Sequence, residues 1–386
     1  MPASWPMLRW FSCVAALLLS ACGGGSGDAG MGTATVSTAT GSTNTATSTT
    51  TATPTAAVSA YAMSRLVADA ATAGAAHVDR NLVNAWGVAF NPAAFVWVNN
   101  AGTDTSTLYD GAGVPQSLVV AVPRGTAASA APTGIVFNGS QAFQVTRNGL
   151  RGPAIFIFAG EGGTISGWSP GVDATNAVTM VDDSAAGASY TGLAIGSASN
   201  LLYAANFRRG AVAVFDAGFA RTATPGGFTD PNLPAGYAPY GIQAIGDLVY
   251  VAYARTDATG RNASAGAGLG LVDTFTASGA LVKRLIAPGG ALNAPWGMAL
   301  APVGFGTFSN ALLVTNTGDG KINAFDPNSG ALLGTLTQAD GSAIAIDGLH
   351  GIAFGNDRNA QPSTALFFAA GPAGGTHGLY GRIDRR

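Results

Sequence analysis

The sequence predicts an all-β fold, a single six-bladed β-propeller over residues 61–386, preceded by a short apolar leader and a linker of simple composition. Three observations predict it: a glycine-centred phrase recurs six times, short apolar strands that end in polar turns follow its copies, and residues that build surface helices are scarce. Glu161 is the only glutamate, and Lys283 and Lys321 are the only lysines. The chain therefore has little material for amphipathic helices.

The recurring phrase is a bulky or polar residue, then glycine, then a short apolar strand. It reads AWGVAF, PTGIVF, YTGLAI, PYGIQAI, PWGMAL and LHGIAF, with its glycines at Gly87, Gly134, Gly192, Gly241, Gly297 and Gly351. The 326 residues from 61 to 386 supply about 54 for each of six units. Four short strands in a unit of this length are typical of a propeller blade, and near-equal units disfavour an array of β-sandwiches.

The two ends of this region predict how the ring closes. The last unit stops after its third strand, at 377–383, and the segment 64–70 (SRLVADA) precedes the first unit without a partner. We expect 64–70 to supply the outer strand of the last blade. That pairing would join the two ends of the region and remove an open edge.

The first 22 residues resemble the signal peptide of a bacterial lipoprotein. The apolar stretch from Trp10 to Leu19 is too short to span a bilayer, and it ends in Leu19-Ser20-Ala21-Cys22, which resembles a lipobox. We therefore predict a signal peptide over 1–21, lipid on Cys22 and a flexible Gly/Ser/Thr/Ala linker over 22–60. The alternative is an ordinary signal peptide in which Cys22 is incidental.

These features predict a location and exclude some partners. The protein is expected at the bacterial cell envelope, held there by lipid on Cys22. The outer membrane or cell surface is favoured over the inner membrane, because Gly23 stands where an Asp would favour inner-membrane retention. The net charge of −2 and the absence of a basic run argue against nucleic acid. Cys13 and Cys22 are the only cysteines, so residues 61–386 hold no disulfide and no thiolate metal site.

Several longer stretches carry a family resemblance. They are NLVNAWGVAF (81–90), FTDPNLPAGYAPYGIQAIG (228–246), APWGMALAP (294–302), LLVTNTGDGKINAFDPNSG (312–330) and IDGLHGIAFGN (346–356). On these the chain resembles an uncharacterised bacterial family of exported propellers related to NHL-repeat proteins, some of whose members carry a PEP-CTERM sorting tail. This chain ends at Arg386 without such a tail, and its anchor is expected at Cys22. The resemblance implies fold and export and brings no known reaction.

The residues before the repeat glycines are expected to form a ring near the propeller axis. They are Trp86, Thr133, Thr191, Tyr240, Trp296 and His350. Aromatic faces, hydroxyls and an imidazole in one place suit a small ligand, for example a sugar or a planar or cationic group. The alternative is that these side chains plug the axis and pack against the glycines.

The alternative interpretation is a metal site on the axis. Lactonase-like propellers hold calcium with acidic and Asn side chains around the axis, and resemblance to them nominates Glu161, Asn206 and Asn316. The asparagines would otherwise stabilise tight turns. His77, His350 and His377 show no zinc-ligand spacing. No cofactor is predicted, and calcium enters only under this alternative.

The leading functional prediction is a non-enzymatic binding or scaffolding propeller displayed on the envelope, with a small molecule, glycan or protein as its partner. No nucleophile elbow, phosphate loop or CxxC motif is present to indicate a reaction. The alternative is a metal-dependent lactonase-like hydrolase or lyase with its site on the axis. The Gly/Ala-rich insertion at 255–270 is expected to form a loop on the rim.

Overall fold

The computed structural model describes residues 60–196 and 200–386. Every described residue belongs to the second of the chain's two units, Ala56–Arg386. The predicted signal peptide, the lipid on Cys22 and the linker up to residue 59 lie outside the described residues and stay predictions. No helix in the described part is long and apolar enough to cross a membrane.

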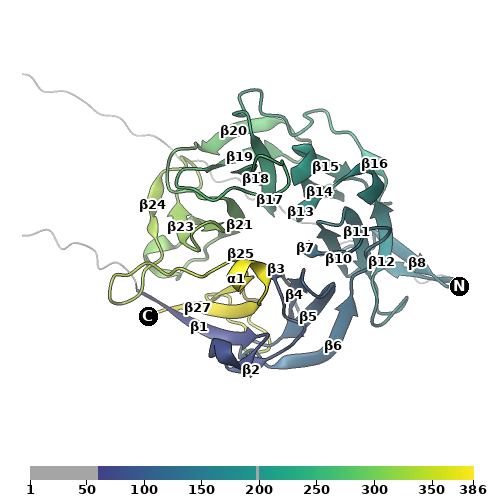
Figure 1. Ribbon diagram of the computed structural model, residues 1–386, viewed down its shortest axis with the longest axis horizontal. Helices are drawn as coiled ribbons and strands as arrows, with labels where there is room; N and C mark the ends of the chain where they lie inside the picture. Colours follow the sequence, from purple (N-terminus) through teal and green to yellow (C-terminus); the bar gives the residue numbers. More distant parts are fainter. Residues whose placement is uncertain (1–59, 197–199) are drawn as a thin grey trace, which may run out of the picture. The chain divides into compact units, whose positions relative to one another are not determined.

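The second unit is a β-propeller of six blades arranged around a common axis (Figure 1), which confirms the predicted fold. Three blades follow each other from residue 85. The first contains β3 (Ala85–Phe90), β4 (Val96–Asn100), β5 (Thr105–Tyr109) and β6 (Pro115–Ala121). The second contains β7 (Pro132–Phe137), β10 (Phe156–Gly160), β11 (Thr164–Trp168) and β12 (Val178–Asp182). The third contains β13 (Tyr190–Gly196), β14 (Leu201–Asn206), β15 (Ala211–Phe215) and β16 (Arg221–Thr222).

The other three blades complete the ring. The fourth contains β17 (Tyr237–Ile245), β18 (Leu248–Arg255), β19 (Gly270–Thr276) and β20 (Leu281–Ile286). The fifth contains β21 (Pro295–Leu300), β22 (Leu312–Asn316), β23 (Ile322–Phe325) and β24 (Leu332–Thr335). The sixth contains β25 (Leu349–Phe354), β26 (Leu366–Ala370) and β27 (Leu379–Arg385), with β1 (Tyr61–Ala68) and β2 (His77–Val78) outside them.

The pairing of β1 with β27 closes the ring as predicted. The two strands are antiparallel, with Tyr61 opposite Arg385 and Ala68 opposite Leu379. The N-terminal strand therefore serves as the fourth strand of a blade whose other three strands come from the C-terminal end. Figure 1 shows these two segments side by side.

A few short elements lie between the blade strands. The second blade carries a hairpin that the repeat pattern did not predict, β8 (Gln144–Arg147) paired with β9 (Leu150–Pro153). Single helical turns occur at η1 (Ala71–Ala73), η2 (Ser184–Ala186), η3 (Phe207–Arg209), η4 (Gly306–Phe308) and α1 (Pro372–Gly375). None of these turns is long enough to form a separate layer.

The hydrophobic core lies between the blades. Six apolar clusters each join one blade to the next, for example Trp97 of the first blade with Phe156 and Trp168 of the second. A blade alone would expose one apolar face, and closing the ring buries all six. A seventh cluster fills the axis, and it contains the predicted ring of aromatic residues.

Candidate binding site on the propeller axis

Four of the six predicted ring residues meet as an aromatic plug on the axis. The imidazole of His350 stacks on Trp86 with ring centroids 3.7 Å apart and an interplanar angle of 14°. The rings of Trp296 and Tyr240 are roughly perpendicular to that of Trp86, and their centroids lie 5.6 and 6.0 Å from its centroid. Each of these four side chains is less than a tenth exposed. They therefore pack mainly on one another, as the second interpretation expected, and their faces are not open stacking platforms.

The two threonines of the ring hold neighbouring blades together. The hydroxyl of Thr133 donates to the carbonyl of Tyr190 at 2.8 Å, and the hydroxyl of Thr191 donates to the carbonyl of Tyr240 at the same distance. The indole of Trp296 donates to the carbonyl of Thr191 at 2.8 Å. Because these groups are satisfied within the protein, they tie inner strands across blades rather than offering free contacts to a ligand.

Above the plug, the blade-connecting loops enclose a polar cavity of about 470 Å³, which we call the axial cavity. Its lining includes Trp86, Thr191, Tyr240 and His350 from the ring and Glu161 from the loop after β10. Thr133 and Trp296 are not among its lining residues. Further walls come from Asn84, Phe207, Arg261, Asn262, Ala263, Thr317, Asp347, Gly348, Gly371, Gly374 and Gly375. The volume falls within the range of small-ligand sites.

His350 presents a neutral imidazole to this cavity. Its Nδ1 lies 3.1 Å from the carbonyl oxygen of Ala85, which can only accept, so Nδ1 carries the proton. Burial lowers the pKa of His350 to about 3, although the bond to Ala85 acts in the opposite direction. Nε2 has no hydrogen-bond partner among the described residues and is not a fully buried atom. It is thus an acceptor that a ligand in the axial cavity can reach.

Glu161 supplies a carboxylate to the same cavity. Its side chain is exposed to water in the cavity mouth, yet the surrounding protein displaces enough solvent to raise the pKa of Glu161 above its ordinary value. Burial, and next the charge of Glu161, raise the pKa of Tyr240. The Tyr240 phenol therefore stays protonated and can donate a hydrogen bond near this carboxylate.

The nominated calcium ligands are not brought together. The amide oxygen of Asn206 accepts from the backbone amides of Ser189 and Arg209, and that of Asn316 accepts from the amide of Asn293. Only Glu161 of the three lines the axial cavity. Within residues 60–196 and 200–386 no cluster of His, Cys, Asp and Glu could hold a metal ion. The residues present do not fit a calcium centre, and the asparagines stabilise turns instead.

Several cavity residues were missed because they stand in loops between the repeat phrases. Asp347 precedes β25, and Arg261 and Asn262 belong to the insertion in the fourth blade, which reaches the axial cavity. Asp257 organises that insertion by accepting from the amides of Thr259 and Arg261. The sequence does show the insertion, but it does not indicate that the insertion lies over the axis.

Fold and site together define the chain as a six-bladed propeller with an aromatic plug beneath a polar axial cavity. No family model matches. Two proteins of Acanthamoeba polyphaga mimivirus are similar to this chain over most of their length. Uncharacterized protein R648 is 34% identical, in a match that covers 80% of this chain and 76% of the viral protein. Uncharacterized protein L690 is 31% identical, in a match that covers 80% of this chain and 82% of the viral protein. The chain belongs to the family of these proteins.

This result corrects the expected family. The resemblance to a bacterial family of exported propellers was wrong, because the curated relatives are viral proteins and no family model supports the assignment. The relation to propeller proteins holds. The assignment to NHL repeats within that class stays a prediction.

Three solved structures are similar to this chain at low sequence identity. Virginiamycin B lyase from Staphylococcus aureus is 14% identical with a TM-score of 0.45, covering 84% of this chain and 99% of that one. A streptogramin B lyase is 12% identical with a TM-score of 0.47, covering 85% and 98%. A gluconolactonase from Xanthomonas campestris is 14% identical with a TM-score of 0.45, covering 79% and 87%. At such low identity these likenesses say nothing about a reaction.

Proposed function

We propose that the axial cavity binds a small polyhydroxylated ligand of about the size of a mono- or disaccharide. The observation that carries the proposal is the mixture of groups around one cavity. Glu161, Asp347 and Nε2 of His350 accept hydrogen bonds, whereas Arg261, Asn262 and Tyr240 can donate them. A sugar presents donors and acceptors together on each hydroxyl, and so it matches such a lining better than a purely apolar or purely anionic molecule.

The geometry favours recognition by hydrogen bonds at a rigid floor. The aromatic plug is already packed, so a ligand contacts its upper edges without rearranging the core. His350 keeps one tautomer because Nδ1 is engaged with Ala85 and the ring is stacked on Trp86. A fixed acceptor above a rigid floor reduces the entropy lost on binding.

Calorimetric titration of the purified protein with a panel of sugars tests the proposal. We expect one class of sugar to bind, and Glu161→Gln to weaken its affinity about tenfold, or roughly 1.4 kcal/mol. Asp216→Asn, a carboxylate in an exposed turn of the third blade, is the matched control and should leave the affinity unchanged. If no sugar in the panel binds, or if both variants behave alike, the proposal is wrong.

A second candidate is a metal-independent proton-transfer enzyme acting on a lactone or an elimination substrate. Glu161 favours it, because a carboxyl with a raised pKa is a better acid near neutral pH. His350, with a pKa of about 3, is a poor base at that pH. Glu161→Gln separates the two functions: it should lower turnover of an active lactone about a hundredfold or more if Glu161 transfers the proton. A panel of lactones without turnover removes this candidate.

A further inference from the structure

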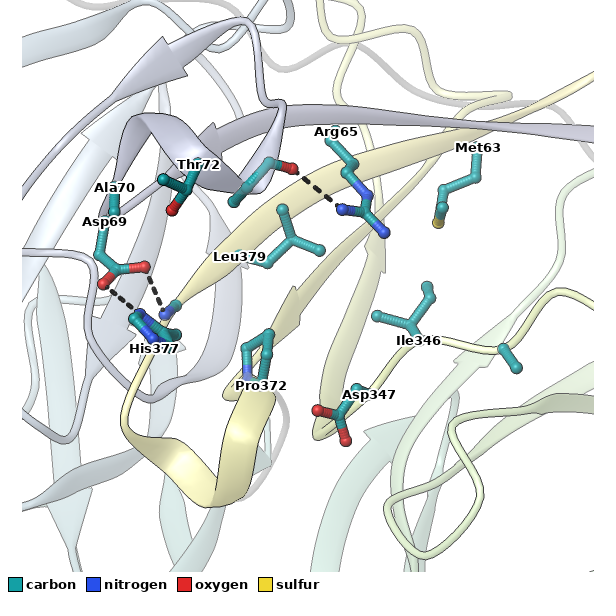
Figure 2. A pocket seen from close by; sticks show the side chains of 13 residues that line it. Met63, Arg65, Asp69, Ala70, Thr72, Ile346, Asp347, Pro372, His377 and Leu379 are labelled. Carbon is teal, nitrogen blue, oxygen red and sulfur yellow. Dashed lines mark hydrogen bonds and ion pairs between the residues drawn. The ribbon is translucent and has the colours of Figure 1, made fainter.

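A second cavity lies at the closure of the ring, between the N-terminal strand β1 and the C-terminal segment. We call it the seam pocket. It encloses about 240 Å³, smaller than the sites of drug-sized ligands. Its walls come from residues 63–73 at one end of the described chain and from residues 345–347 and 372–379 at the other. Figure 2 shows these segments facing each other across the pocket.

Two opposite charges face this pocket from different walls. The Nη1 of Arg65 donates to the carbonyl of Ala73 at 2.9 Å, which holds the guanidinium in place and leaves its other N–H groups to donate elsewhere. The Oδ2 of Asp347 accepts from the amide of Ala373 at 2.8 Å, so Oδ1 is left for a further donor. In Figure 2 Arg65 and Asp347 lie on opposite sides of the pocket.

The floor between these charges is apolar. Leu379 and Ile346 are almost completely buried, and they line the pocket together with Met63 and Pro372. Figure 2 shows Ile346 between Arg65 and Asp347, with Leu379 and Pro372 to one side. An apolar group lying here would bury surface without displacing a polar contact of the protein.

Asp69 and His377, which also line the pocket, are hydrogen-bonded to each other. Asp69 accepts from Nδ1 of His377 at 2.8 Å and from the amide of Gly378 at 3.1 Å. Both of its oxygens are therefore engaged. Arg65 and Asp347 keep hydrogen-bonding capacity toward a ligand.

We propose that the seam pocket binds a small zwitterion with an apolar side chain, a free amino acid or a dipeptide. The ligand carboxylate would pair with Arg65, the ammonium group with Oδ1 of Asp347, and the side chain would lie on Leu379 and Ile346. Because the walls come from both ends of the described chain, such a ligand would also hold the ring closed. It therefore raises the thermal midpoint by binding only the closed form.

Titration calorimetry and thermal unfolding of the protein with leucine and leucyl-leucine test the proposal. N-acetyl-leucine lacks the ammonium group, and leucinamide lacks the carboxylate. We expect at least one zwitterion to bind and to raise the midpoint. Each blocked compound should bind at least tenfold more weakly than leucine. Equal binding of leucine and N-acetyl-leucine would overturn the role of Asp347 and with it the proposal.

Arg65 lines only the seam pocket, whereas Asp347 lines both cavities, so the Arg65 variant localises the binding. Arg65→Gln should weaken zwitterion binding at least tenfold, whereas Arg124→Gln should not change it. Arg124 is the matched control, because it is also exposed and its Nη1 also donates to a backbone carbonyl, that of Ala128 at 3.1 Å. In Asp347→Asn, leucine and N-acetyl-leucine should bind with equal affinity.

The axial cavity serves as an internal reference. Glu161→Gln changes the axial cavity and should leave zwitterion binding unchanged, since Glu161 does not line the seam pocket. Zwitterion binding that depends on Glu161 and not on Arg65 would place the ligand on the axis and overturn the proposal. The absence of binding by any zwitterion tested would overturn it as well.

Discussion

At the residue scale, an unusual charge cluster lies outside both cavities, in the fourth blade. Asp273 on β19 is fully buried, and neither of its carboxyl oxygens has a hydrogen-bond partner among the described residues. Arg284 on β20 forms an ion pair with Asp230, and its Nε lies 3.5 Å from Asp273. One guanidinium thus faces two carboxylates, near the phenol of Tyr253. Burial, and next the charge of Asp230, raise the pKa of Asp273 to about 7.

This cluster predicts a pH dependence of stability. The ordinary pKa of an aspartate is 3.8, so between about pH 4 and pH 7 the folded state holds a proton on Asp273 that the unfolded chain has lost. The contribution of Asp273 is fully present below about pH 4 and is lost as the pH rises through about 7. Asp273→Asn is uncharged at every pH and so avoids the buried charge that forms on Asp273 at high pH. At pH 8 we expect the variant to be more stable than wild type, by about 2 kcal/mol.

Chemical denaturation of wild type and Asp273→Asn at several pH values between 4 and 8 measures this difference. The gain in free energy of unfolding should grow with pH and level off above pH 7. Asp216→Asn is again the surface control and should follow the wild-type curve. A difference between Asp273→Asn and wild type that does not change with pH would show that Asp273 carries no proton in the folded state.

At the element scale, the innermost strands pass close to one another at the repeat glycines. A Cβ placed on Gly241 of β17 would lie 1.9 Å from the carbonyl oxygen of Trp296 on β21. A Cβ on Gly87 of β3 would lie 2.4 Å from the carbonyl of Thr133 on β7. Each glycine therefore allows one blade to approach the next, which explains why the phrase recurs once per blade.

Gly241→Ala is accordingly expected to lower the free energy of unfolding by about 3 kcal/mol or more, because the backbone of two blades must separate. It should also disturb the aromatic plug through Trp296, which tryptophan fluorescence would report. Gly290→Ala is the control, since a Cβ there meets nothing within 4 Å. Similar unfolding midpoints for the two variants would contradict the close approach.

At the scale of the whole molecule, stability depends on closure by β1. Tyr61 at the start of this strand packs against Phe305 and Phe308 of the fifth blade, and its hydroxyl donates to the carbonyl of Phe305 at 2.8 Å. The strand pairs with β27 along almost its whole length. The N-terminal strand thus completes one blade and fastens it to the preceding one.

A chain that begins at residue 70 should therefore be much less stable than one that begins at residue 60. Without β1, β27 becomes an open edge, so we expect self-association and a thermal midpoint lower by at least about 10 °C. Tyr61→Phe, which removes only the hydroxyl, should cost about 1 kcal/mol. Calorimetry and size-exclusion chromatography check both. A monomeric shortened chain with an unchanged midpoint would contradict closure by β1.

Much of the fold could be predicted from the sequence because the constraint that forms a blade is local and repeated. The glycine phrase marked all six inner strands, and the unpaired segment 64–70 overlaps the closing strand β1. The hairpin β8–β9 was not predicted, because it occurs in one blade only. The repeat also predicted that Trp86, Tyr240, Trp296 and His350 meet at the axis.

The chemistry of the site was less predictable, because it depends on loops from different blades. Residues far away in the chain decide which polar atoms remain free: the carbonyl of Ala85 accepts from Nδ1 of His350, and the carbonyl of Tyr240 accepts from the hydroxyl of Thr191. Asn206 and Asn316 were nominated as metal ligands, but their amide oxygens accept from backbone amides.

The sequence by itself determined the number of blades, the residues that face the axis and the way the ring closes, because periodic glycines and alternating strands act over a few residues. Only the tertiary structure decided which side chains share a cavity. Asp347 with Arg261 at the axis, and Arg65 with Asp347 at the seam, are separated by 86 residues or more in the chain. Ring closure brings these residues together, and a local sequence pattern cannot predict contacts between residues so far apart in the chain.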